Sequence, residues 1–396
     1  MFERLPYLPA DPILGLMSAF NADTTEHKVD LGAGVYKNES GETPIMQAVT
    51  QAQSIWAKQE STKSYAAPAG FTDFNEGIVE LLLGEKHPAL IAQRVASIQT
   101  TGGCAALSIA AGMLKRCKED VKIWVSNPTW ANHTPLLSGA GLELVEYPYY
   151  NFDTNEIDFD AMMSTLSNAS QGDLVLLHGC CHNPSGADLN KQQWHEICQL
   201  LIKQGAIPFV DIAYQGLGDG LDKDAYGLRH LAQECPEMII ASSCSKNFGL
   251  YRERVGAIVV VAKHKDTASV CQGQLLNVVR QIYSMPPSHG AALVGIILKS
   301  ADLTAVWQQE LLNMRQRISD LRLTLTQHLA TAGAGGRFDY IKKEKGMFSF
   351  LGISREQVHT LKQEHNIYMV DSSRINVAGL NKANMDYVVD SLLRVI

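Results

Sequence analysis

The chain has 396 residues, of which 46% are hydrophobic and 19% charged, and these values predict a globular protein of ordinary composition with two domains. The formal net charge of −7 argues against a nucleic-acid-binding protein, which usually carries a basic excess. The longest apolar run, residues 291–298, is too short to span a bilayer, and the N-terminal segment lacks the basic-then-apolar order of a signal peptide. Eight cysteines without such a signal predict reduced thiols and a cytoplasmic location.

Apolar and amphipathic segments alternate from about residue 100 to residue 262. Apolar strands are expected at 121–126, 141–148, 173–179, 206–214, 239–243 and 256–262, with amphipathic helices at 102–117 and 191–205. Strands that are apolar on both faces and separated by helices indicate a mostly parallel sheet covered on both sides. In such sheets, functional residues collect outside the carboxyl ends of the strands.

Beyond residue 304 the periodicity becomes that of a long helix. Apolar residues recur at steps of four and three, at Trp307, Leu311, Met314, Ile318, Leu321 and Leu325. A helix over 305–328 would be about 36 Å long, enough to cross from one domain to another. The tail is expected to form a strand, a helix and a strand, at 346–353, 355–370 and 372–380.

These patterns predict the domain organisation. Residues 1–40 are expected to form an N-terminal arm and part of a small α+β domain. Residues 41–304 are expected to form the large domain, and residues 305–396 the linking helix and the rest of the small domain.

Polar residues of distinct kinds follow the apolar strands. They are His178, His182 and Asn183 after one strand, Asp211 and Tyr214 after the next, Ser243, Ser245 and Lys246 after a third, and Gly102 and Gly103 at the mouth of a helix. Taken singly, each has an ordinary explanation, such as a turn glycine or a buried histidine. The segment HGCCH resembles a metal cluster, but zinc ligands are spaced by two to four residues and paired with a second knuckle. We therefore predict no metal site.

Lys246 allows two chemical interpretations. In the first, Ser243 and Lys246 form the S-x-x-K pair of a serine acyl hydrolase, but the S-D-N and K-T-G segments of that class occur nowhere in the chain. In the second, Lys246 forms a Schiff base with pyridoxal phosphate. That cofactor needs amides, hydroxyls and an arginine for its phosphate, a carboxylate for its ring nitrogen, donors for its ring oxygen and an aromatic ring for stacking. The chain offers Gly103, Cys104, Ser243 and Arg254 for the phosphate, Asp211 for the nitrogen, Tyr214 and Asn183 for the oxygen, and Trp130 for the stack.

With these residues assigned, the chain closely resembles the class I aminotransferases, specifically the aspartate and aromatic amino acid aminotransferase group. The resemblance rests on DPILGLM, LGAGVYKNESGETPIM, SNPTWANH, HGCCHNPSG, DIAYQG, SKNFGLYRERVGA, YSMPPSHGA, MRQRI, GMFSF and RINVAGL. No single segment is decisive, but their joint order and spacing are specific. The resemblance implies an α/β protein of the pyridoxal-phosphate-dependent transferase fold type I. It would have a mostly parallel seven-stranded sheet in the large domain, a smaller α+β domain, and active sites shared within a homodimer.

The resemblance also implies roles around the cofactor. Lys246 is the Schiff-base and proton-transfer residue, Asp211 binds the ring nitrogen, and His178 orients Asp211. The remaining cofactor residues are Asn183 and Tyr214 at the ring oxygen, Trp130 on the ring, and Gly103, Cys104, Ser243, Ser245, Arg254 and the neighbouring subunit's Tyr65 at the phosphate.

A second set of residues is implied to bind the substrate. Arg374 binds the α-carboxylate with Gly34 alongside it, and Phe348 lines the pocket together with Trp130 and Asn183. Arg280 crosses the interface to bind the distal carboxylate of a dicarboxylic substrate.

These roles imply transamination of L-aspartate, of aromatic amino acids (tyrosine and phenylalanine), or of both, with 2-oxoglutarate. The products are L-glutamate and a 2-oxo acid, formed by a ping-pong mechanism. A β-lyase or decarboxylase on the same fold is the alternative, and keto-acid-dependent turnover would separate the two. Cys104 stands where the family generally has Ser or Thr, and Met285 where it has Asn or Ser. Arg280 favours dicarboxylates and Met285 favours dual specificity, so the substrate preference stays open; neither nucleic acid nor a membrane is an expected partner.

Overall fold

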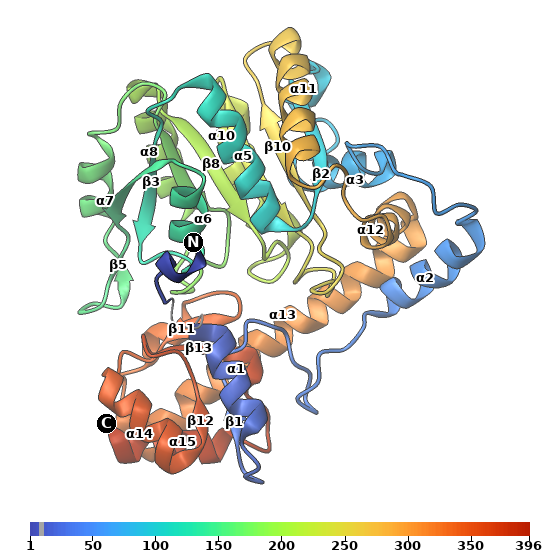
Figure 1. Cartoon of the computed structure of the whole chain (residues 1–396). Coiled ribbons are helices and arrows are strands. Elements are labelled where there is room, and N and C mark those ends of the chain that lie inside the picture. Colours follow the sequence, from blue (N-terminus) through green and yellow to red (C-terminus); the bar gives the residue numbers. More distant parts are fainter. Residues whose placement is uncertain (8–11) are drawn as a thin grey trace. The chain divides into compact units, whose positions relative to one another are not determined.

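The structure is a computed structural model that describes residues 1–7 and 12–396 (Figure 1). Residues 8–11, which belong to the predicted N-terminal arm and include the first residue of DPILGLM, lie outside the described residues. The fold consists of two compact units. The larger contains residues 44–316 and 344–346, and the smaller contains residues 1–43, 317–343 and 347–396.

A seven-stranded sheet forms the centre of the larger unit. Its strands, in spatial order, are β2 (Val95–Thr100), β10 (Gly256–Val261), β9 (Met238–Ser243), β8 (Ile207–Ile212), β7 (Leu174–His178), β3 (Lys122–Asn127) and β4 (Glu143–Pro148). All neighbours run parallel except β10, which is antiparallel to β2 and β9. The predicted mostly parallel sheet of an α/β fold is therefore confirmed. A short hairpin, β5 (Tyr150–Asn151) with β6 (Glu156–Ile157), lies outside this sheet.

Helices cover both faces of the sheet (Figure 1). The helices of the larger unit are α2 (Gln47–Gln59), α3 (Thr72–Leu83), α4 (Pro88–Ile91), α5 (Gly103–Cys117), α6 (His133–Gly139), α7 (Phe159–Leu166), α8 (Lys191–Gln204), α9 (Leu221–Asp224), α10 (Tyr226–Glu234), α11 (Lys265–Ile282) and α12 (His289–Lys299). On one face, apolar residues of α5 and α11 pack against apolar residues of the strands. This core includes Ile109 of α5, Leu275 of α11, Ile98 of β2 and Phe209 of β8. Such burial of aliphatic and aromatic side chains is the main stabilising contribution to the unit.

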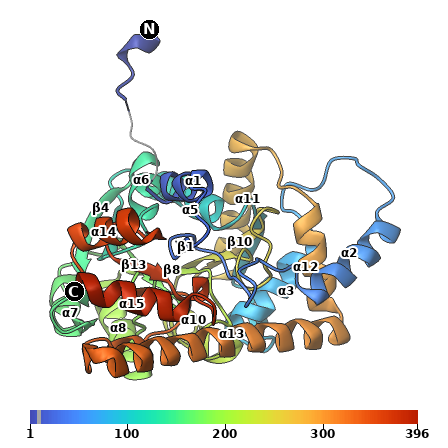
Figure 2. The same cartoon turned by 90° about the horizontal axis from the view of Figure 1, so that it is seen from below.

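The helix α13 (Ala301–Leu329) begins in the larger unit and ends in the smaller one. Its 29 residues span about 44 Å at the usual rise, and Figure 2 shows its full length. The predicted apolar stripe is buried, since Trp307, Leu311, Ile318 and Leu325 are at most 1% exposed. Stacking of Trp307 on Phe248, with ring centroids 4.4 Å apart, fixes the first half of the helix in the larger unit.

Among the described residues, no single helix has the length and apolar character needed to cross a membrane. The pair α12 and α13 reaches that threshold only together, and it is bent by 103°.

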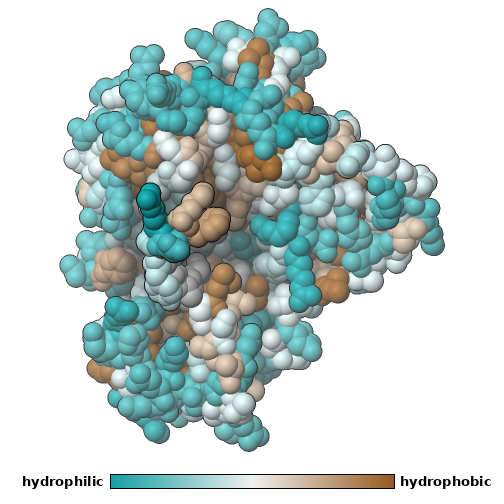
Figure 3. Space-filling model, in the orientation of Figure 1, coloured by the Kyte–Doolittle hydropathy of each residue, from teal (hydrophilic) through white to brown (hydrophobic). Residues whose placement is uncertain are grey.

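The smaller unit is an α+β assembly around its own core. It contains α1 (Pro12–Ala22), α14 (Arg355–His365), α15 (Met385–Val395), the parallel pair β1 (Val29–Asp30) and β12 (Ile367–Tyr368), and the antiparallel pair β11 (Phe348–Phe350) and β13 (Arg374–Asn376). Apolar residues from the second half of α13, from α14 and from α15 fill its core. Short 3-10 segments complete it at Phe2–Arg4, Asp339–Lys342 and Val377–Gly379. Hydrophilic side chains cover most of the face drawn in Figure 3, where apolar side chains form separate small groups.

Candidate active site

Asp211 and Lys246 leave the sheet at the same edge. The strands β8 and β9 are parallel neighbours with Ile212 opposite Ser242, so the end of β8 lies beside the segment that leads from Ser243 to Lys246. The sequence produces this because both strands are apolar until their last residues, where polar side chains can reach the rim of the sheet. The two residues that the predicted chemistry requires therefore lie at the same edge of the sheet.

The carboxylate of Asp211 is largely buried and bound by a histidine. His133, the first residue of α6, places Nε2 3.0 Å from Asp211 Oδ2. Burial alone would raise the pKa of Asp211, but the hydrogen bond and charge of His133, with His178 and Lys246 nearby, outweigh it and hold the pKa below its ordinary value. Asp211 is therefore an ionised acceptor, and His133 Nε2 carries the proton between them.

A chain of hydrogen bonds continues behind His133. Its Nδ1 lies 2.8 Å from Thr129 Oγ1, which is 3.2 Å from His178 Nε2. Burial, and then the charge of His133, lowers the pKa of His178 to about 3, so His178 is neutral. Thr129 Oγ1 therefore bridges the two imidazoles, and the contacts link His178 to Asp211 through Thr129 and His133.

This chain relates His178 to Asp211 through two intermediate residues, Thr129 and His133. The resemblance implies that His178 orients Asp211, and the two are indeed opposite each other on β7 and β8. The hydrogen bond to Asp211 nevertheless comes from His133, which the start of α6 places beside the carboxylate. In the segment SNPTWANH we assigned a role only to Trp130, and no sequence pattern indicated that Thr129 and His133 would be linked.

The remaining ring-binding residues belong to the same edge of the larger unit. Lys246 Nζ lies over the ring of Tyr214, 4.9 Å from its centroid, and Tyr214 and Asn183 are buried at 6% and 5% exposure. The indole of Trp130 meets the His133 ring edge to face, with centroids 5.2 Å apart. The structure thus connects Trp130 to Asp211 through His133.

Glycines and an arginine form a cradle at the start of α5. Gly102 has a φ of +84°, and a Cβ added there would lie 2.6 Å from Arg254 Nη2. Among the described residues no side chain caps the N-terminus of α5, so its first backbone N–H groups can donate hydrogen bonds to an anion. Ser243 lies beside Gly103, and its hydroxyl donates to Ser245 Oγ at 3.1 Å. The cradle brings together a guanidinium, two hydroxyls and helix amides, which is the donor set that a phosphate needs.

Cys104 is the second residue of α5, next to this cradle. Its Sγ accepts a weak hydrogen bond from Asn132 Nδ2 at 3.8 Å. The thiol is a poorer donor than the hydroxyl that the family usually has at this position, so the backbone N–H of Cys104 is its stronger contribution.

The predicted carboxylate-binding residues lie together in the smaller unit. Arg374 begins β13, is 5% exposed, and donates from Nη2 to the carbonyl oxygen of Gly32 at 2.8 Å. Its guanidinium lies 4.3 Å from the ring centroid of Phe348. A Cβ on Gly34 would lie 3.2 Å from the same ring, so Gly34 leaves the space beside Phe348 that a side chain would fill.

Two predicted residues stand apart from these groups. Tyr65 is 91% exposed, and within the described residues nothing connects its side chain to another predicted residue. Arg280, exposed in the last turn of α11, donates to Ser284 Oγ. The chain by itself therefore does not bring either residue to the cofactor edge.

The sheet edge and its cradle are those of a pyridoxal-phosphate enzyme, and the comparisons identify the family. The chain belongs to the aminotransferase class I and II family, whose profile matches residues 26–392. It is 45% identical to the aspartate aminotransferase of Haemophilus influenzae over the full length of both chains. It is 43% identical to an aromatic-amino-acid aminotransferase of Pseudomonas aeruginosa, covering 100% of this chain and 98% of the other.

A solved structure confirms the fold and the cofactor. The aromatic-amino-acid aminotransferase of Burkholderia pseudomallei, covalently bound to pyridoxal phosphate, superposes with a TM-score of 0.97 at 41% identity, over 100% of this chain and 99% of the other. The protein is therefore an aminotransferase of this fold, and its cofactor is pyridoxal phosphate. The cradle of Gly102, Gly103 and Arg254 and the ionised Asp211 fit the phosphate and the ring of that cofactor.

Proposed function

We propose that the protein transfers the amino group of L-aspartate and of aromatic amino acids to 2-oxoglutarate. The observation that carries this proposal is the ionised Asp211 at the strand end beside Lys246, together with the Arg374 and Phe348 pair, which suits a carboxylate next to an aromatic surface. Relatives that are 39–45% identical are aspartate or aromatic-amino-acid aminotransferases, which supports both substrate classes.

The roles of the cofactor-binding residues follow from their positions. Asp211 would hold a proton on the ring nitrogen, and Tyr214 and Asn183 would donate to the ring oxygen. Trp130 would stack on the ring. The phosphate would lie in the cradle of Gly103, Cys104, Ser243, Ser245 and Arg254, at the N-terminus of α5.

Pyridoxal phosphate, when bound, supplies an aldehyde that takes up the amino group and a protonated ring that withdraws electrons. Lys246 Nζ would remove the α-proton of the amino acid and later return it, as a single general base. Arg374 would hold the α-carboxylate in a bidentate fork beside Gly34 and Phe348. This fixed orientation is the main contribution of the chain to the rate.

We also propose a homodimer in which each active site takes Tyr65 and Arg280 from the neighbouring subunit. Both side chains are exposed, and the apolar Ile45, Ile55 and Ile282 near them in sequence are exposed as well. A dicarboxylate would then place its distal carboxylate on Arg280. The larger unit would be the cofactor domain and the smaller unit the substrate-closing domain. The eight free cysteines favour a cytoplasmic location.

Substrate preference is tested by the half-reaction. The cofactor-loaded enzyme would be mixed separately with L-aspartate, L-tyrosine and L-phenylalanine, without a 2-oxo acid, while its absorbance spectrum is followed. We expect comparable conversion to the pyridoxamine form by aspartate and by an aromatic amino acid. Conversion by aspartate alone would reduce the proposal to an aspartate aminotransferase. Turnover that needs no 2-oxo acid would instead support the β-lyase or decarboxylase alternative.

Met285 is the residue to change if both classes react. It follows Ser284, which binds Arg280 and has a φ of +70°, so its side chain borders the segment that holds Arg280. Met285→Asn would add a polar group there, and we expect the ratio of aspartate to phenylalanine conversion to rise several-fold. Met314→Leu, a change in the long helix, is the matched control and should leave the ratio unchanged.

A further inference from the structure

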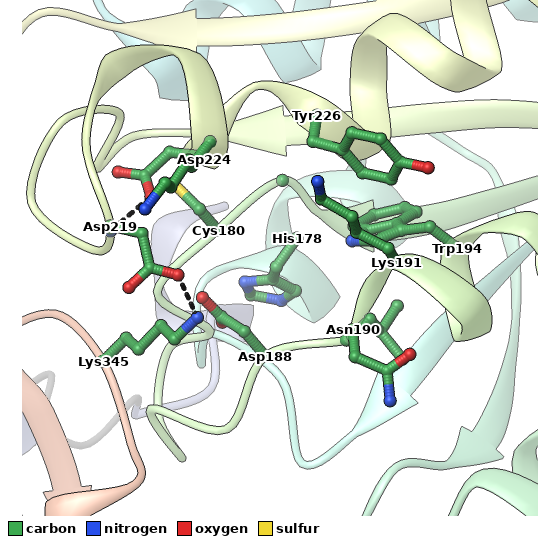
Figure 4. Close-up of a pocket in the computed structure, with 13 residues that line it drawn as sticks. His178, Cys180, Asp188, Asn190, Lys191, Trp194, Asp219, Asp224, Tyr226 and Lys345 are labelled. Carbon is green, nitrogen blue, oxygen red and sulfur yellow. Dashed lines mark hydrogen bonds and ion pairs between the residues drawn. The ribbon is translucent and has the colours of Figure 1, made fainter.

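A second cavity opens in the larger unit, beside the N-termini of α8 and α10 (Figure 4). Its volume is about 400 Å³, which is within the usual size of a small-molecule site. Of the residues predicted for the active site, only His178 lines it. Since no other part of the cofactor edge takes part, the cavity is a separate site.

The lining carries equal numbers of positive and negative groups. The lysines are Lys191, Lys223 and Lys345, and the acids are Asp188, Asp219 and Asp224. A neutral balance of this kind does not select a simple anion or cation. It does select a ligand with both charges, provided that the two signs are separated in space.

Figure 4 shows this separation. Asp219, Asp224 and Lys345 lie at one side of the cavity, and Lys191 lies at the other with Trp194 and Tyr226. Lys345 is already paired with Asp219. The two sides therefore differ in charge, with the acidic groups on one and an uncompensated lysine on the other.

Asp188 offers a carboxylate with capacity left for a cation. Its two oxygens accept the backbone N–H groups of Cys181 and His182, at 2.7 and 2.8 Å. The charge of Lys345 acts on Asp188 as well as on its ion-pair partner Asp219, so one lysine serves more than one carboxylate on this side. Burial raises the pKa of Asp188 to about 6, and an ammonium group placed beside it would favour its ionised form. Asp224 differs, because three backbone N–H groups, of Gly216, Gly218 and Asp219, already bind its oxygens.

The opposite side offers donors for a carboxylate and a surface for an apolar group. Lys191 is the first residue of α8, and its Nζ lies over the face of the Tyr226 ring, 5.0 Å from the centroid. Tyr226 borders the same side of the cavity (Figure 4). Trp194 packs its indole against Gly227 of α10, where a Cβ would lie 2.2 Å from the ring, so the aromatic wall is fixed in place.

We propose that this cavity binds a free amino acid with an apolar or aromatic side chain. Its carboxylate would face Lys191, its ammonium would face the acidic side with Asp188, and its side chain would lie along Trp194 and Tyr226. The bound amino acid would also lie beside His178, the outer member of the hydrogen-bond chain that ends at Asp211. This binding does not depend on the proposed function.

Fluorine NMR of the cofactor-loaded enzyme tests the proposal site by site. The chain has five tryptophans, which can be replaced by 5-fluorotryptophan and assigned by single Trp→Phe variants. The Trp194 resonance reports on this cavity and the Trp130 resonance on the active site. The probes are L-phenylalanine, 3-phenylpropionate with only the negative charge, and 2-phenylethylamine with only the positive charge.

We expect the Trp194 resonance to shift saturably with L-phenylalanine and not with either single-charge probe. Lys191→Ala should weaken this response about tenfold, as the loss of one charge-assisted hydrogen bond predicts. Lys203→Ala, an exposed lysine at the other end of α8, should leave it unchanged. If Lys191→Ala is unstable, Lys191→Gln, which keeps most of the stem and removes the charge, provides the same comparison.

The proposal is overturned if Trp194 does not respond to L-phenylalanine, or if 3-phenylpropionate shifts it equally. The same titration separates the two sites. A silent Trp130 with an unchanged cofactor spectrum would count against phenylalanine as a substrate, whereas the Trp194 response would still decide the second site.

Discussion

At the scale of single residues, one imidazole sets the charge of the carboxylate on which the chemistry depends. Burial opposes the ionisation of Asp211, and the hydrogen bond of His133 is the largest favourable contribution that counters it. Without His133 the burial effect would dominate, and the pKa of Asp211 would rise. The ring nitrogen of the cofactor would then lose its anionic partner at a higher pH than in the wild type.

We therefore expect His133→Ala to move the acid limb of the kcat/KM profile upwards by about one pH unit and to lower kcat at neutral pH about tenfold or more. The measurement is the pH profile of aspartate transamination between pH 5 and 9. His195→Ala, on the exposed side of α8, is the control and should follow the wild type. A reduced kcat with an unmoved acid limb would mean that His133 acts only through packing.

At the scale of elements, the proposed phosphate site depends on the close approach of the turn at Gly102 to the Arg254 side chain. Gly102 combines a φ of +84° with 2.6 Å between a built Cβ and Arg254 Nη2. An alanine there costs about 1–2 kcal/mol for the left-handed backbone alone, and it also displaces the guanidinium. We expect Gly102→Ala to weaken retention of the cofactor at least tenfold.

Cofactor release, followed by absorbance after gel filtration into buffer without pyridoxal phosphate, measures this effect. Gly139→Ala at the end of α6 is the matched control, because a Cβ there meets no atom within 4 Å. Equal release from the two variants and the wild type would show that the cradle is not the phosphate site.

The sequence predicted the elements that bury apolar faces and the residues that follow them along the chain. The ends of β7, β8 and β9 carry His178, Asp211 and Ser243, and strand register alone brings these positions together. The sequence could not identify His133 as the partner of Asp211, because that contact depends on where α6 begins in space. The second cavity was missed for a similar reason, since Lys191, Asp188 and Tyr226 come from separate loops and helices.

At the scale of the whole molecule, buried neutral histidines make stability depend on pH. His182 is 1% exposed, hydrogen-bonded to Ser126 and Ser185, and stacked on Tyr149. Burial and the charges of neighbouring histidines lower its pKa well below the ordinary value of 6.5. Below pH 6.5 the unfolded chain therefore binds one proton more at this residue than the folded chain. As the pH decreases below 6.5, the free energy of unfolding therefore decreases by up to about 1.4 kcal/mol per pH unit.

We expect the stability advantage of the wild type over His182→Asn to shrink by about 2–3 kcal/mol between pH 6.5 and 4.5. Urea unfolding followed by circular dichroism at several pH values measures the difference in the free energy of unfolding. The contributions of groups that titrate in both proteins, such as Asp188, cancel in this difference. His195→Asn, an exposed histidine, should track the wild type. A difference that stays constant with pH would mean that His182 is not neutral in the folded protein.

The last prediction at this scale concerns the proposed sharing of active sites between two subunits. If a site uses Lys246 of one subunit and Arg280 of the other, Lys246→Ala and Arg280→Ala homodimers each lack a residue in both sites. A hybrid dimer has one site with both changes and one site with neither. Equal mixing after dissociation gives hybrids as half of the dimers, so about one quarter of the wild-type activity towards aspartate should return. Activity that stays at the level of the two separate variants would place Arg280 in the same site as Lys246 of its own chain. A mixture of Lys246→Ala with Lys263→Ala controls for the mixing procedure.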